Sequence, residues 1–95
     1  MITIRSDEGG FAITGHAGYA QPGQDIVCAA ISALLQTFVA AAEELTADKL
    51  NCVISAGNAV IRYTDLSEQG QLLMRSFFIG VQMIAESYPQ YVRLV

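Results

Sequence analysis

The sequence has few cysteines, few charged residues and few basic residues, and each shortage excludes a class of protein. Its 95 residues include two cysteines, too few for the dense disulfide framework of a small secreted domain. Charged residues make up 15% and hydrophobic residues 53%, which excludes a mainly disordered chain. Nine acidic residues outnumber five basic ones, giving a net charge of −4, which argues against direct binding to nucleic-acid phosphates.

Long hydrophobic runs and targeting signals are also lacking. The longest uncharged stretch covers residues 26–42 and includes polar residues such as Gln36, whereas a bilayer-spanning helix needs roughly 20 mostly apolar residues. We therefore expect a buried helix there and no membrane partner. The first eight residues do not follow the pattern of a signal peptide, which predicts a cytoplasmic location. The length predicts a single domain over residues 1–95.

Five segments have the composition of β-strands. They cover residues 2–5, 11–14, 51–56, 59–64 and 91–95. Turn residues between the first two predict one hairpin, and the Gly57-Asn58 pair predicts a two-residue turn in a second hairpin.

Two long segments have apolar residues at three- and four-residue steps, which predicts amphipathic helices. Asp25 is suited to cap the first helix, over residues 26–45, and Asp65 and Glu68 resemble a capping box for the second. Pro89 should end the second helix. Its predicted core stripe consists of Leu72, Leu73, Phe77 and Val81, with a dimer interface as the other use. The element order ββαββαβ predicts an α+β fold with two helices packed on a mainly antiparallel sheet.

One pair of residues could carry chemistry. His16 is the only histidine, and Cys28 follows it across the glycine-rich residues 15–24, at the third position of the first predicted helix. A helix N-terminus favours thiolate over thiol, and a nearby imidazole can accept a proton and later give it to a departing amine. The backbone N–H groups of the helix start could also stabilise an oxyanion.

Structural interpretations of the same residues stay open at this point. Cys28 could be a small buried hydrophobe and His16 a solvated turn residue. Asp25 could cap the helix or orient His16. Cys52, in a predicted strand, is expected to be a core residue, although a redox-sensing disulfide with Cys28 is an alternative. Two cysteines and one histidine leave a structural zinc site one ligand short, so no metal or other cofactor is expected.

The residues around this pair carry a family resemblance. The segments Gly15-His16-Ala17 and Asp25-Ile26-Val27-Cys28-Ala29-Ala30-Ile31-Ser32 closely resemble the two signature motifs of Prp, the bacterial ribosomal-processing cysteine proteases. The resemblance extends over essentially the whole chain. It implies an endopeptidase that removes the N-terminal extension of a large-subunit ribosomal protein, the twenty-seventh of that series, through an acyl-enzyme. It also implies a homodimer.

The resemblance further implies roles for six residues. Cys28 would be the nucleophile and His16 its base and then acid, while Gly15 and Ala17 would shape the backbone around the imidazole. Asp25 and Ser32 match family positions and would support the site or bind substrate. Family substrates are cut after an aromatic pair in a basic extension, which implies a hydrophobic groove with an acidic rim, covered by residues 17–24. Bacteriophage structural proteins are alternative substrates, and a non-catalytic peptide-binding dimer of the same fold is an alternative function.

Overall fold

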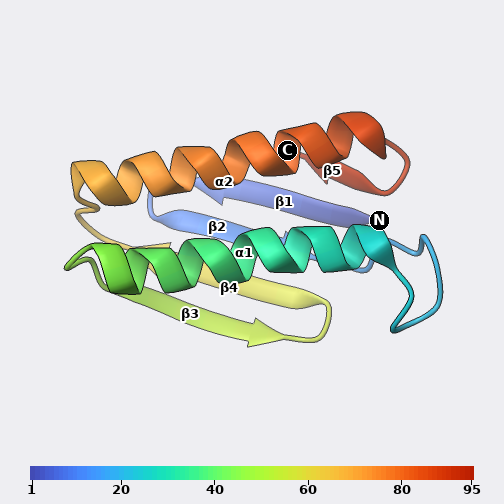
Figure 1. Ribbon diagram of the computed structural model, residues 1–95, viewed down its shortest axis with the longest axis horizontal. Coiled ribbons are helices and arrows are strands. Elements are labelled where there is room, and N and C mark those ends of the chain that lie inside the picture. The colour runs from blue at the N-terminus through green and yellow to red at the C-terminus, as the bar shows by residue number, and fades with distance from the viewer.

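Both helices lie on one face of a five-stranded sheet (Figure 1). The computed structural model describes residues 1–95. Its elements are β1 (Ile2–Asp7), β2 (Gly10–Thr14), α1 (Ile26–Leu45), β3 (Leu50–Ser55), β4 (Asn58–Tyr63), α2 (Glu68–Ser87) and β5 (Val92–Leu94). The strand order across the sheet is β3-β4-β2-β1-β5. Only the β1–β5 pair is parallel, so the predicted order ββαββαβ and the mainly antiparallel α+β fold are confirmed.

The hydrophobic core fills the space between the sheet and the two helices. Alternate strand residues such as Ile4, Phe11 and Ile61 are almost fully buried, because side chains on a strand point to opposite faces in turn. Phe11 stacks on Phe77 of α2, with ring centroids 5.0 Å apart, and lies 6.0 Å from the ring of Phe38 in α1. Burying a side chain of this size contributes roughly 1.5–3 kcal/mol. These aromatic contacts join both helices to the middle of the sheet.

Helix α1 is the more apolar of the two helices. By length and composition it could cross a membrane, with a mean hydropathy of 1.8 over 18 residues. In this structure it lies along the sheet, and five residues of one stripe are buried there: Val27, Ile31, Leu35, Phe38 and Ala42. Gly80 of α2 lets the two helices approach closely, because a Cβ at that position would lie 2.9 Å from Leu34 of α1.

Two details differ from the sequence prediction. Ser67 caps α2, with its side chain accepting the N–H of Gly70, whereas Asp65 lies outside the helix with φ of 53°, so the capping-box prediction is wrong. The β3–β4 turn is Ala56-Gly57 rather than Gly57-Asn58, since Ser55 pairs with Asn58. The left-handed φ of 72° falls on the second turn residue, where glycine is favoured.

One predicted core position is also not buried. Leu72 is 67% exposed in the single chain, while Phe77 and Val81 are buried as expected. The apolar stripe predicted from the spacing is wider than the part of the helix surface that packs against the rest of the protein. Residues at the edge of the stripe therefore remain exposed.

Candidate active site

Helix α1 begins with a carboxylate cap that also organises the residues around Cys28. Asp25 has an extended backbone conformation, and its Oδ1 accepts the N–H groups of Val27 at 3.0 Å and Cys28 at 2.9 Å. These N–H groups have no carbonyl partner within the helix, so a short acceptor side chain at this position stabilises the first turn. The predictions that Asp25 is the N-cap and Cys28 the third helical residue are confirmed.

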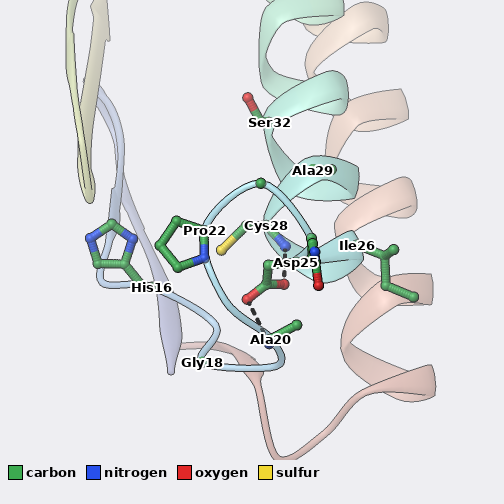
Figure 2. Close-up of a pocket in the computed structure, with 11 residues that line it drawn as sticks. His16, Gly18, Ala20, Pro22, Asp25, Ile26, Cys28, Ala29 and Ser32 are labelled. Carbon is green, nitrogen blue, oxygen red and sulfur yellow. Dashed lines mark hydrogen bonds between the residues drawn. The ribbon is translucent and has the colours of Figure 1, made fainter.

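The other oxygen of Asp25 holds the glycine-rich loop. Its Oδ2 accepts the N–H of Tyr19 at 3.1 Å. It also accepts the N–H of Ala20 at 3.4 Å (Figure 2). The hydrogen bond from the Cys28 N–H, and then those from the loop, hold the pKa of Asp25 below its usual range, with burial acting in the opposite direction. The hydrogen bonds to this carboxylate all come from backbone N–H groups. The structure therefore shows Asp25 capping the helix and tethering the loop, with no hydrogen bond to His16.

The loop has a second attachment through an aromatic side chain. The ring of Tyr19 packs edge-on against Tyr88 and Tyr91, with centroids 5.6 Å and 5.3 Å apart. This contact joins the loop to the segment that follows α2.

The Cys28 side chain points from α1 into a cavity and is partly buried (Figure 2). Its Sγ accepts the backbone N–H of Ala17 at 3.3 Å. Ala17 is itself buried, at 4% exposed, which fixes this donor beside the sulfur. A donor directed at sulfur stabilises negative charge on it.

His16 follows the end of β2, on the opposite side of the cavity from α1 (Figure 2). The preceding residue, Gly15, has a left-handed φ of 90°, and a Cβ there would collide with the carbonyl of Met1. Its N–H donates to the carbonyl of Gly57 in the β3–β4 turn at 2.9 Å. Glycine is thus required immediately before His16 for both backbone conformation and space.

Two adjoining cavities share the side chains of His16, Cys28 and Ser32. The larger, about 640 Å³, lies between the glycine-rich loop and the start of α1, and Pro22 is part of its wall. The smaller, about 240 Å³, lies between α1 and the β3–β4 turn, with mostly hydrophobic lining residues. The two sequence motifs therefore meet in space at one divided groove.

Ser32 lies one turn after Cys28 and faces both cavities. Its hydroxyl accepts the side-chain N–H of Gln36 at 2.7 Å.

Some residues of the groove were missed by sequence analysis, and one expectation about it was wrong. The smaller cavity is walled by Ile54, Ser55, Ala56, Gly57 and Asn58, whose only sequence signal was that of a hairpin turn. The acidic rim is not found among the lining residues. Asp25 is their one acidic member, and its carboxylate is directed to backbone N–H groups.

The helix start also offers fewer oxyanion donors than expected. The N–H groups of Val27 and Cys28 are taken by Asp25, and that of Ala29 donates to the Asp25 carbonyl. The donor present at the sulfur is the Ala17 N–H, which comes from the loop.

Cys52 lies apart from this groove. It is half-buried in β3, packed against the core, and both cysteines are free. Burial, and then the charge of Glu43, raises the pKa of the Cys52 thiol. No group of three or more His, Cys, Asp and Glu side chains is placed to hold a metal ion.

Comparison with known proteins decides the family. A family model described as cysteine protease Prp matches residues 1–93. The chain belongs to the Prp family. The ribosomal processing cysteine protease Prp of Staphylococcus aureus (strain Mu50) is 34% identical over 103 residues, covering 99% of this chain and 97% of the relative. That of Mycoplasma genitalium is 30% identical over 96 residues, covering 97% and 92%.

Solved Prp structures agree with this assignment. S. aureus Prp in complex with a covalently linked product peptide has a TM-score of 0.92 at 32% identity, over 99% of this chain and 97% of that one. The same protease in complex with a substrate peptide has a TM-score of 0.83 at 28% identity, over 99% and 95%. This Prp-family protein is a cysteine protease with the fold of those structures.

Proposed function

We propose that this Prp-family protein removes the N-terminal extension of a large-subunit ribosomal protein, the twenty-seventh of that series, with Cys28 and His16 as its catalytic dyad. The observation that carries the proposal is that these two side chains line the same two adjoining cavities, although they come from different elements. The names of the S. aureus and M. genitalium relatives, ribosomal processing cysteine proteases, support this substrate class.

The chemistry follows from the placement of the groups. His16 accepts the thiol proton of Cys28, and Sγ attacks the carbonyl carbon of the scissile bond. The Ala17 N–H, 3.3 Å from Sγ, is a donor for the oxyanion that forms beside it. His16 then protonates the departing amine, which leaves a thioester on Cys28 and frees the new N-terminus of the ribosomal protein. Water, activated by His16, hydrolyses the thioester and releases the extension.

The two cavities fit an extended peptide on both sides of the sulfur. Apolar side chains wall the smaller cavity, among them Ile13, Ile31 and Leu35, so it suits a hydrophobic or aromatic residue of the extension. The larger cavity is bordered by the loop of residues 17–24, which is held by Asp25 and is expected to cover bound substrate. The similar S. aureus protease forms a complex with a substrate peptide, which supports a peptide as the ligand of this groove.

Cleavage of defined peptides tests the proposal. Wild-type protein should cut a peptide bearing the ribosomal extension, and mass spectrometry should detect a covalent intermediate with Cys28. Cys28→Ser and His16→Ala should each abolish turnover while circular dichroism shows the fold retained. Cys52→Ser is the matched control and should cut at the wild-type rate, because Cys52 lies outside both cavities. Turnover by Cys28→Ser would refute the dyad. Cleavage of a phage structural peptide alone would refute the ribosomal substrate.

We also propose that the protein is a cytoplasmic homodimer that needs no cofactor. The outer face of α2 exposes Ile79 and Met83, each at 62%. Arg75 and Glu86 lie near opposite ends of that face, so antiparallel pairing of two copies of α2 would place opposite charges together. Light scattering after size exclusion should give a dimer mass, and Ile79→Asp should give a monomer. A wild-type monomer at tens of micromolar would contradict this assembly.

A further inference from the structure

The β3–β4 turn lies directly against the proposed catalytic histidine. A Cβ built on Gly57 would lie 2.6 Å from Nε2 of His16, 3.2 Å from Cε1 and 3.3 Å from Cδ2. The first distance is shorter than real Cβ atoms show, and all three atoms form the Nε2 edge of the ring. The space for this edge exists because residue 57 has no side chain.

Gly57 also holds the backbone just before His16. The carbonyl of Gly57 accepts the N–H of Gly15, at 2.9 Å, immediately before His16. The turn therefore holds the residue before the histidine by a main-chain hydrogen bond and lies against the imidazole itself. Figure 2 shows the other ring nitrogen, Nδ1, on the side of the ring toward Cys28.

We propose that Gly57 is a positioning residue for His16. The turn packs against the Nε2 edge of the imidazole and directs Nδ1 into the groove, where it exchanges the proton with Cys28. This inference rests on the proposed catalytic role of His16. The three atoms nearest a Cβ at Gly57 all belong to His16, so Gly57 acts on the reaction through the histidine.

Two substitutions separate this role from backbone strain. Gly57 has a φ of 72°, where any L-residue is strained, but asparagine adopts this conformation more readily than alanine. Gly57→Ala and Gly57→Asn both add the Cβ that meets the imidazole. If strain alone matters, Gly57→Asn should approach wild-type behaviour. If contact with His16 matters, both variants should displace the ring.

The ring can be observed directly, because His16 is the only histidine in the chain. We expect both variants to shift the two carbon-bound imidazole proton signals in NMR spectra. In assays with the extension peptide, kcat should fall by between about tenfold and 100-fold with KM within about twofold, since small misplacement of a catalytic group has effects of that size. Alkylation of Cys28 by iodoacetamide should slow in both.

Val53→Gly is the matched control, since it tests whether weakening the β3–β4 hairpin is enough to lower kcat. Val53 is 63% exposed on β3 and lines neither cavity. This variant should lower the stability of the hairpin yet keep the His16 signals and kcat of the wild type.

Three results would overturn the inference. They are unchanged His16 signals in both folded Gly57 variants, wild-type kcat in Gly57→Asn, and an equal loss of kcat in Val53→Gly. If His16→Ala instead retains wild-type turnover, the proposed dyad fails. The NMR signals would then still decide whether Gly57 holds the ring.

Discussion

The carboxylate of Asp25 accepts the backbone N–H of Cys28 at 2.9 Å. The side chain that caps α1 is therefore hydrogen-bonded to the residue that carries the proposed nucleophile. Its second oxygen holds Tyr19 and Ala20 of the loop. One side chain therefore fixes both the helix that carries the sulfur and the loop that borders the groove. It also occupies the helix N–H groups that an oxyanion would otherwise use, which leaves the Ala17 N–H as the donor at the sulfur.

Replacing Asp25 should separate its two functions. Asp25→Asn keeps an acceptor for the helix cap but loses the negative charge that draws four N–H groups together, and Asp25→Ala loses both. We expect faster amide exchange at Tyr19 and Ala20 in both variants, and faster exchange at Val27 and Cys28 mainly in Asp25→Ala. Hydrogen exchange measured by NMR would show this. Equal protection of the loop in wild type and Asp25→Ala would mean that other contacts hold it.

Acid should destabilise the protein through three carboxyls. The side chain of Arg62 lowers the pKa of Asp7, the Cys28 N–H lowers that of Asp25, and the Ser67 hydroxyl lowers that of Asp48. A lowered folded pKa means that the unfolded chain binds more protons. Their stabilisation is therefore complete above the ordinary value of 3.8 and is lost as pH falls from there through the lowered values.

Urea unfolding across this pH range is the measurement. The free energy of unfolding should be flat with respect to these groups above about pH 5 and fall below about pH 4. Asp25→Asn should reduce the slope in acid, because that residue no longer titrates. An acid slope identical to that of wild type would show that Asp25 contributes nothing.

The cap of α2 makes a separate contribution to stability. The Ser67 hydroxyl accepts the N–H of Gly70 at 3.0 Å and donates to Asp48 Oδ2 at 2.8 Å. Ser67→Ala should therefore lower the free energy of unfolding by about 1 kcal/mol. Ser76→Ala, at an exposed position within α2, is the control and should be close to neutral. An unchanged free energy of unfolding in Ser67→Ala would refute a stabilising role of this cap.

The predicted core stripe of α2 contains both a buried residue, Phe77, and an exposed residue, Leu72, whose contributions can be compared by the free energy of unfolding. Phe77 is 3% exposed and packs against Phe11, so Phe77→Ala should cost about 3–5 kcal/mol. Leu72 is 67% exposed in the single chain, so Leu72→Ala should change monomer stability by less than about 0.5 kcal/mol. A large loss in Leu72→Ala that depends on protein concentration would place Leu72 in the dimer interface.

Local sequence signals predicted the elements well where the signal lies in a few neighbouring residues. Asp25 before an apolar periodic run predicted both the start of α1 and the third-residue position of Cys28. The cap of α2 was misplaced because Asp65 and Ser67 are both good cap residues. The contact of Ser67 with Asp48, distant in sequence, distinguishes them in the structure.

By itself, the sequence determined the element order, the two motifs and the family resemblance, because helix periodicity, strand alternation and capping depend on near neighbours along the chain. Only the tertiary structure decided that His16, Cys28 and Ser32 share a divided groove, that Asp25 tethers the loop, and that Gly57 lies against the imidazole. These relations join residues from separate elements. Their distances are set by how the sheet and helices pack, which no local pattern specifies.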